Sequence, residues 1–135
     1  MRNPRFLLPV LVTALLAAAV PAASALDTAS CVGVPATIRG TASAETLTGT
    51  EGPDVILAGG GDDVVSGLGG DDLICAGPGS DRVAGGAGND RIIGGRDDDV
   101  LEGGPGADLI VDGAGDDRLV GGPGPDHLAP GIGAD

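Results

Sequence analysis

The chain has 135 residues, and its 20 acidic residues outweigh seven basic ones, all arginine, to give a formal net charge of −13. It contains no tryptophan, no tyrosine and a single phenylalanine. Because this composition offers neither a basic patch for a phosphate backbone nor an aromatic platform for bases, we do not expect nucleic acid as a partner, and an anionic membrane surface would repel the chain.

The N-terminus predicts a secretory signal peptide over residues 1–25. Two arginines precede an apolar run over residues 6–20, and small residues follow at 23–25, which is the usual cleavage spacing. The alternative is a membrane anchor, but about 15 apolar residues are short for a span of roughly 20. All 20 acids and five of the arginines lie after residue 25, so the mature net charge would be −15. We therefore expect a secreted, extracellular protein.

From Gly40 onward the chain repeats with a period of nine residues and without insertions. The repeats are GTASAETLT, GTEGPDVIL, AGGGDDVVS, GLGGDDLIC, AGPGSDRVA, GGAGNDRII, GGRDDDVLE, GGPGADLIV, DGAGDDRLV and GGPGPDHLA, followed by the fragment PGIGAD. The sixth place is always acidic, the eighth is always aliphatic in the complete repeats, and glycine dominates the second and fourth. A flexible glycine-rich linker would not keep acid and aliphatic residues in strict phase, so the pattern indicates a folded repeat.

The spacing within each repeat predicts its geometry. Three residues, such as 91–93, leave room for a short strand after each acid, and the middle residue points inward because side chains alternate along a strand. The six glycine-rich residues then form a turn, and two turns with two strands close one coil. Successive coils would stack in parallel about 4.8 Å apart, which places repeats n and n+2 above one another. We therefore predict an all-β fold, a parallel β-roll that is a two-sheet right-handed β-solenoid, over residues 40–135.

The stacked acids require a cation. Asp81, Asp99 and Asp117 would form a column with about 5 Å between neighbours, where two unit charges repel by roughly 0.8 kcal/mol in water and several-fold more at an effective dielectric of about 20. Calcium is the natural candidate because it takes six to eight oxygens, including backbone carbonyls, which glycine turns expose. Zinc prefers His or Cys ligands, and magnesium prefers few protein ligands in a strict octahedron.

Three of the repeats, GGAGNDRII, GGPGADLIV and GGPGPDHLA, match the pattern GGxGxDxUx, where U is aliphatic. In this the chain resembles the RTX (repeats-in-toxin, hemolysin-type) calcium-binding family, whose nonapeptide this is. The resemblance implies a parallel β-roll in which several calcium ions (Ca2+) lie between the turns of repeats n and n+2, held by sixth-place aspartates and loop carbonyls. The implied metal ligands are Asp54, Asp63, Asp72, Asp81, Asp90, Asp99, Asp108, Asp117, Asp126, Asp135, Gly86, Gly88, Gly104, Gly106, Gly122 and Gly124.

Some repeats depart from the family pattern. Glu45 replaces the aspartate of the first repeat, which also lacks the loop glycines, so we do not count a site there. Leu68 stands where the second glycine is usual, and Asp97 stands in place of the fourth. Two pairs of stacked loops fit the family pattern best: 85–90 with 103–108, and 103–108 with 121–126.

No catalytic set is evident in the sequence. His127 is the only histidine, and no Cys–His or Ser–His arrangement has support. The stretch DDDVLE resembles an EF-hand loop only faintly, because Leu101 stands where an oxygen ligand is expected. We therefore expect a non-enzymatic protein.

Residues 26–39 are predicted to form an N-terminal capping segment. Counting back nine residues puts Ile38 at an inward place, so Thr37–Arg39 would add a strand above Val55–Leu57. An oxidising compartment also favours a disulfide between Cys31 and Cys75.

The path of residues 31–36 decides whether this disulfide can form. A standard loop would hold Cys31 beyond the Cα limit of about 7 Å from Cys75. An extended stretch reaches roughly 17 Å and could descend the outer face of the roll, with Val32 and Val34 covering the strand below. The alternative is two free thiols.

One outer face of the roll is expected to be apolar, and such a face usually has a partner or a cover. Its residues are Val55, Leu57, Leu73, Cys75, Ile93, Leu109 and Val111. The leading hypothesis is a secreted, non-enzymatic calcium-binding protein that folds on calcium binding. The alternative is an extracellular adhesion or partner-binding module that uses the roll as a calcium-dependent scaffold, with a protein or cell-surface partner that the sequence does not identify.

Overall fold

The structure is a computed structural model that describes residues 30–135. The predicted signal peptide, and the first residues of the predicted capping segment, lie outside the described residues. Within residues 30–135 no helix is long and apolar enough to cross a membrane.

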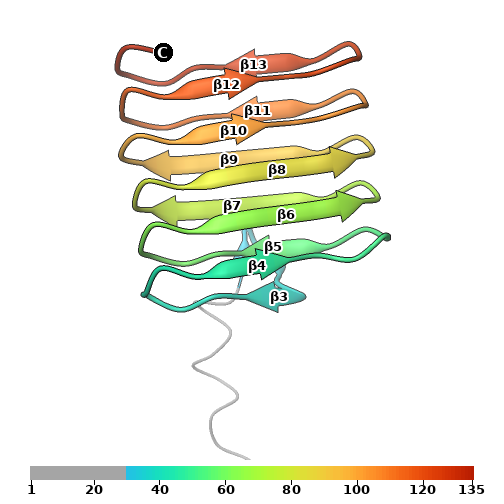
Figure 1. Ribbon diagram of the computed structural model, residues 1–135, viewed down its shortest axis with the longest axis horizontal. Coiled ribbons are helices and arrows are strands. Elements are labelled where there is room, and N and C mark those ends of the chain that lie inside the picture. The colour runs from blue at the N-terminus through green and yellow to red at the C-terminus, as the bar shows by residue number, and fades with distance from the viewer. Residues whose placement is uncertain (1–29) are drawn as a thin grey trace, which may run out of the picture.

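Short strands follow one another along the described chain, and from β3 onward they alternate between two sheets (Figure 1). They are β1 (Ser30–Cys31), β2 (Val34–Pro35), β3 (Ile38–Arg39), β4 (Thr46–Thr48), β5 (Val55–Leu57), β6 (Val64–Gly69), β7 (Leu73–Pro78), β8 (Arg82–Ala87), β9 (Arg91–Arg96), β10 (Val100–Glu102), β11 (Leu109–Val111), β12 (Arg118–Val120) and β13 (His127–Ala129).

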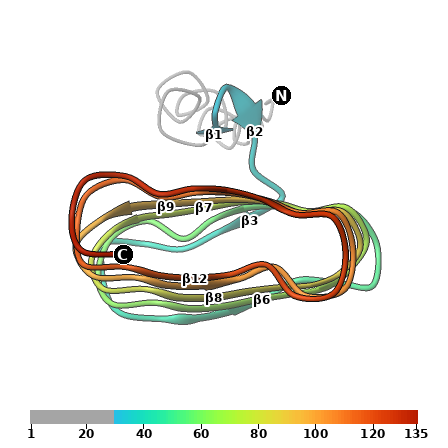
Figure 2. The same ribbon diagram turned by 90° about the horizontal axis from the view of Figure 1, so that it is seen from above.

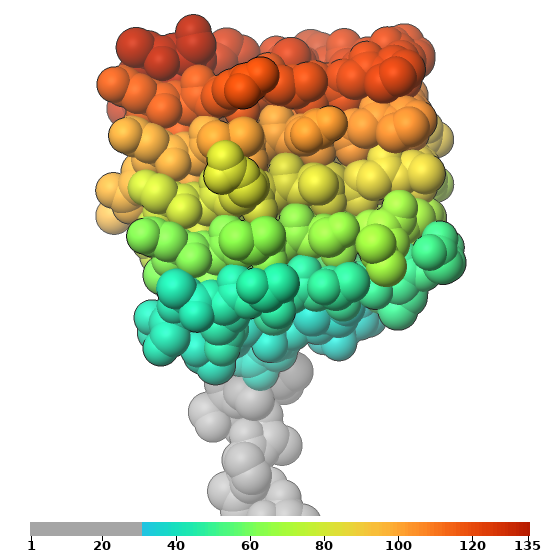
Figure 3. Space-filling model, in the orientation of Figure 1, coloured from blue at the N-terminus to red at the C-terminus, as the bar shows by residue number. Residues whose placement is uncertain are grey.

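The two main sheets are parallel and form the two walls of the roll. One sheet has the order β13-β11-β9-β7-β5-β3, and the other has the order β12-β10-β8-β6-β4. Each strand pairs with the strand two repeats away, as Ile56 does with Ile74 and Val65 does with Val83. Seen from above, the coils superimpose as one flattened ring (Figure 2), and in the space-filling view they stack in chain order (Figure 3). The predicted parallel β-roll is confirmed.

The core is a double row of aliphatic side chains between the two walls. Eighth-place residues are buried from Ile56 to Ile110, because the middle residue of each strand points inward. Two first-place alanines, Ala58 and Ala76, join this cluster. Since each repeat contributes only one large apolar side chain, the core is narrow.

The N-terminal segment contacts the outside of the six-stranded sheet. Its strand β3 pairs with β5, so the predicted strand above Val55–Leu57 is confirmed. The disulfide between Cys31 and Cys75 is also confirmed, with a Cα–Cα distance of 5.7 Å. Cys31 is fully buried.

The predicted extended path of residues 31–36 is wrong. Strands β1 and β2 pair as an antiparallel hairpin that lies beside the roll (Figure 2). Val32 and Gly33 take positive φ angles of 53° and 83°, so the chain reverses at this point instead of descending the sheet. As a result Val32 and Val34 are 59% and 42% exposed and do not form the expected apolar cover.

Candidate metal centre

The sixth-place acids line the two ends of the roll in two columns. One column precedes the strands of the five-stranded sheet and the other precedes those of the six-stranded sheet. Aspartates are buried at every sixth place from Asp54 to Asp117. Asp126 is half-buried and Asp135 is exposed. The structure therefore brings most of the predicted aspartate ligands into the interior.

Each buried carboxylate is oriented by the coil that precedes it. The Oδ1 atom of Asp108 accepts the N–H of Asp90 at 2.8 Å, and that of Asp90 accepts the N–H of Asp72 at 2.9 Å. The same bond recurs in the other column, where Asp117 accepts the N–H of Asp99 at 2.7 Å. One oxygen of each carboxylate is thus committed to the backbone.

The second oxygen of these carboxylates has no partner. At the sixth place, seven buried Oδ2 atoms lack a hydrogen bond: those of Asp63, Asp72, Asp81, Asp90, Asp99, Asp108 and Asp117. A Cβ built on Gly85 or Gly103 would contact the Oδ2 atom of Asp90 or Asp108, so the first-place glycine makes room for the carboxylate. Native proteins leave few buried polar atoms unpaired, and a hard cation is the partner that suits acceptor-only oxygens.

Burial also raises the pKa values of these groups. Desolvation raises the pKa of Asp99 to about 7 and those of Asp72 and Asp81 to about 6, and neighbouring carboxylates add to the shift, while the backbone hydrogen bond lowers each pKa. Burial raises the pKa of Asp108 in the same way. The ionised columns are therefore unfavourable at neutral pH unless a positive charge lies among them.

Fifth-place side chains release the fourth-place carbonyls. If the parallel hydrogen-bond ladder continued through the turn, the N–H of Ala107 would donate to the carbonyl of Gly88. It donates instead to Oδ1 of Asn89 at 2.9 Å. Likewise the N–H of Asn89 donates to Asp71 at 2.9 Å. Polar residues are frequent at the fifth place because their side chains accept these backbone N–H groups. This role was not predicted, although pairs of acids at the fifth and sixth places are visible in the sequence.

Prolines release the carbonyls of two predicted second-place ligands. The N–H of Ala114 donates to the carbonyl of Gly95 at 3.0 Å, whereas Pro105 and Pro123 stand at the corresponding places above Gly86 and Gly104 and have no N–H. Gly104 has a φ of 110°, and a Cβ there would contact the carbonyl oxygen of Gly86. Of the predicted glycine ligands, Gly86, Gly88, Gly104 and Gly106 line stacked turns, while Gly122 and Gly124 are exposed.

The regular arrangement of carboxylates and turn carbonyls has a counterpart among known proteins. A family model for the RTX calcium-binding nonapeptide repeat, in four copies, matches residues 39–74, 76–110 and 102–135. The chain belongs to the RTX calcium-binding nonapeptide-repeat family. Comparisons with curated proteins and with solved structures gave no match.

The first two RTX repeats differ from the central ones in how their acids are paired. The carboxylate of Glu45 accepts two hydrogen bonds from Thr41, one from its backbone N–H at 2.8 Å and one from its side-chain hydroxyl at 2.9 Å. The Oδ2 atom of Asp54 accepts the hydroxyl of Thr50 at 2.9 Å, and the Oδ1 atom of Asp54 accepts that of Thr37 at 3.4 Å. The second-place threonines, Thr41 and Thr50, provide the partner that the central carboxylates lack.

Leu68 and Asp97, which replace glycines of the RTX pattern, retain the backbone conformation typical of glycine. Leu68 and Asp97 have φ angles of 78° and 77°, although neither is glycine. The stacked turns therefore impose a left-handed conformation at these places whatever the side chain.

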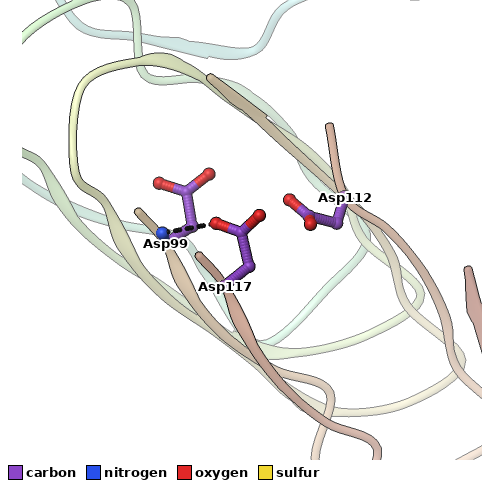
Figure 4. A group of neighbouring side chains, drawn as sticks. All are labelled: Asp99, Asp112 and Asp117. Carbon is purple, nitrogen blue, oxygen red and sulfur yellow. Dashed lines mark hydrogen bonds between the residues drawn. The ribbon is translucent and has the colours of Figure 1, made fainter. Parts of the chain in front are cut away.

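One acidic residue of the RTX roll was missed altogether. Asp112 occupies a first place, is buried, and lies with Asp99 and Asp117 so that one oxygen of each falls within 4.8 Å of the others (Figure 4). The signal in the sequence was an aspartate at a place where most repeats have glycine.

Proposed function

We propose that the chain is a secreted calcium-binding protein without enzymatic activity, and that its roll folds when calcium enters the glycine-rich turns. The observation that carries this proposal is the set of seven buried sixth-place aspartates whose Oδ2 atom has no partner. Several calcium ions between the turns of repeats n and n+2 would pair these oxygens and neutralise the two acid columns.

The proposed ligands are the sixth-place aspartates from Asp54 to Asp135 with the turn carbonyls of Gly86, Gly88, Gly104, Gly106, Gly122 and Gly124. The central loops have the strongest support, because their carbonyls escape the backbone ladder and their carboxylates are unpaired. Asp54 has weaker support, since threonine hydroxyls already contact both of its oxygens.

Charge and core size support a folding transition that depends on metal. The mature chain would carry a net charge of −15, and the core receives one large aliphatic side chain per repeat. A highly charged chain with so little apolar burial does not offset its conformational entropy alone.

Secretion is supported by the signal-like residues 1–25 and by the disulfide, which is compatible with an extracellular location. In this proposal residues 26–39 cap the roll and residues 40–135 bind the ions. The only histidine, His127, is exposed on the edge strand β13, and this exposure supports a non-enzymatic role.

A calcium titration of the mature chain, starting in chelator at neutral pH, tests this function. Circular dichroism should show a disordered spectrum that changes to strand over a steep range of calcium concentration, while equimolar magnesium leaves the spectrum unchanged. A full strand spectrum in chelator, together with no calorimetric calcium binding, would contradict the proposal.

An adhesion or partner-binding role is the second candidate. It is favoured by the outer face of the six-stranded sheet, where Leu73, Ile93, Leu109 and Val111 are only half-buried. Capture of a surface protein from the native cell in calcium, but not in chelator, would favour this role. Loss of that capture in Leu109→Ser would locate the contact on this sheet.

A further inference from the structure

Asp112 brings a carboxylate into the interior at a place that the repeat reserves for small residues. First-place residues face inward, as Ala58 and Ala76 show by their complete burial in the core. Asp112 is itself only 7% exposed, and neither of its carboxylate oxygens has a hydrogen-bond partner. A buried carboxylate with two unpaired oxygens is costly, so the site calls for a positively charged occupant.

Carboxylates converge on this point from both walls of the roll. Asp112 directly follows β11 of the six-stranded sheet, whereas Asp99 and Asp117 precede β10 and β12 of the five-stranded sheet. In Figure 4 the carboxylate of Asp112 faces that of Asp117, and the dashed line is the bond from the Asp99 N–H to Oδ1 of Asp117. Both Asp99 and Asp117 present an unpaired Oδ2 atom.

The backbone of the coil below leaves space for these oxygens. A Cβ built on Gly94 would lie 2.8 Å from Oδ2 of Asp99 and 3.2 Å from Oδ1 of Asp112. The two carboxylates therefore approach each other over a bare Cα, and any side chain at Gly94 would crowd them.

The three carboxylates are close enough to share one ion. Oxygens on opposite sides of a calcium ion lie up to about 5 Å apart. One oxygen each of Asp99, Asp112 and Asp117 lies within 4.8 Å of the other two, so a single calcium ion can contact all three.

We propose that Asp112 is a third carboxylate ligand, together with Asp99 and Asp117, in an interior calcium site of higher affinity than the sites built from two sixth-place aspartates. This inference rests on the proposed function and adds a ligand that the repeat pattern does not supply. The carbonyl of Gly95, in the same pair of turns, already accepts the N–H of Ala114 and is therefore less available to an ion. Asp112 provides an oxygen ligand and a negative charge in its place.

Calcium calorimetry on the mature chain tests this site with two variants and a matched control. Asp112→Asn removes the charge and keeps the shape, and Asp112→Gly restores the residue that most first places hold. Asp116→Asn is the control, because Asp116 is exposed and the substitution removes the same unit charge. The Asp116 carboxylate accepts one hydrogen bond, from the N–H of Ala134, and the asparagine Oδ1 can accept it as Asn89 does from Ala107. We expect the wild type and Asp116→Asn to bind one ion at least about tenfold more tightly than the rest, and both Asp112 variants to lose that tight phase while binding the remaining ions.

Circular dichroism in saturating calcium confirms that each variant retains its strand content, and Asp112→Gly serves if Asp112→Asn does not fold. A tight phase that persists in both Asp112 variants would overturn the site. If the wild type binds calcium with no tight phase, the site is again overturned while the proposed function stands. If the wild type binds no calcium, the proposed function itself fails.

Discussion

The first two loops of the roll and its central loops solve the same electrostatic problem in different ways. Around Glu45 and Asp54, the threonines at the second place give the carboxylates hydroxyl partners. From Asp63 to Asp117 the second place is glycine or Leu68, and one oxygen of each sixth-place carboxylate has no partner. A hydroxyl can therefore take the place of a cation beside a buried acid. For this reason we expect the N-terminal coil to be the part of the roll that depends least on metal.

The largest expected effect comes from removing a central acid. Asp108 accepts the N–H of Asp90 and donates its own N–H to Asp126, so it has an acidic neighbour on each side within its column. Asp108→Ala should weaken two ion sites and lower the free energy of unfolding in calcium by about 5 kcal/mol, at about 2.7 kcal/mol for each site at a hundredfold excess of ligand. Glu45→Ala should shift the calcium midpoint little. Equal shifts of the two midpoints would remove the distinction between the regions.

Loss of the disulfide should be the next largest effect, and it falls on the N-terminal region. The Cys31–Cys75 bond closes a sequence separation of 44 residues and ties the hairpin to β7. In the chain-entropy model its removal costs about 4 kcal/mol. Urea denaturation of Cys31→Ser/Cys75→Ser in saturating calcium measures this cost. Thiol labelling of the denatured, unreduced wild type should find no reactive thiol, and two thiols per chain would refute the bond.

Acid should partly replace metal in the central loops. The raised pKa values of Asp72, Asp81 and Asp99 mean that the folded, metal-free chain binds more protons than the unfolded chain, whose aspartates keep a value near 3.8. Stability without metal is therefore greatest at acidic pH and is lost as the pH rises through about 6 to 7. In chelator the strand spectrum should partly return between about pH 7.5 and pH 5. An unchanged spectrum over this range would argue against metal-linked burial of the acids.

A smaller effect is expected where the two regions meet. Leu68 has a φ of 78° and is 41% exposed, so it bears a left-handed backbone without a compensating burial. Leu68→Gly should stabilise the calcium-bound roll by about 1 kcal/mol, because glycine adopts this conformation without steric cost. Thermal denaturation of the variant beside the wild type gives the sign, and a lower melting temperature would show that the Leu68 side chain contributes to packing.

The nine-residue phase was enough to predict the backbone of the roll. It gave the strand register, the inward eighth-place residues and the two acid columns, because a strict repeat leaves the backbone few ways to stack. It also placed Thr37–Arg39 above Val55–Leu57. The disulfide was predicted with this frame, although the hairpin that carries Cys31 was not, since residues 31–36 lie outside the repeat and turn at Val32 and Gly33.

The nine-residue repeat could not predict the hydrogen-bond partner of each polar group. The hydroxyls of Thr41 and Thr50 reach the sixth-place acids, and Asn89 takes the N–H of Ala107, through side-chain directions that a period does not specify. Asp112 was missed because its importance depends on the inward direction of the first place, which became clear only from the packing.

Hydrogen exchange of the mature chain, with and without calcium at neutral pH, tests the central claim most directly. The amides of Asp81, Asp90 and Asp99 donate to carboxylates one coil above, so their protection reports the acid columns themselves. We predict that these central amides exchange rapidly in chelator and become protected in calcium, while residues 45–57 change less. Equal and full protection of the central coils in chelator would contradict the account.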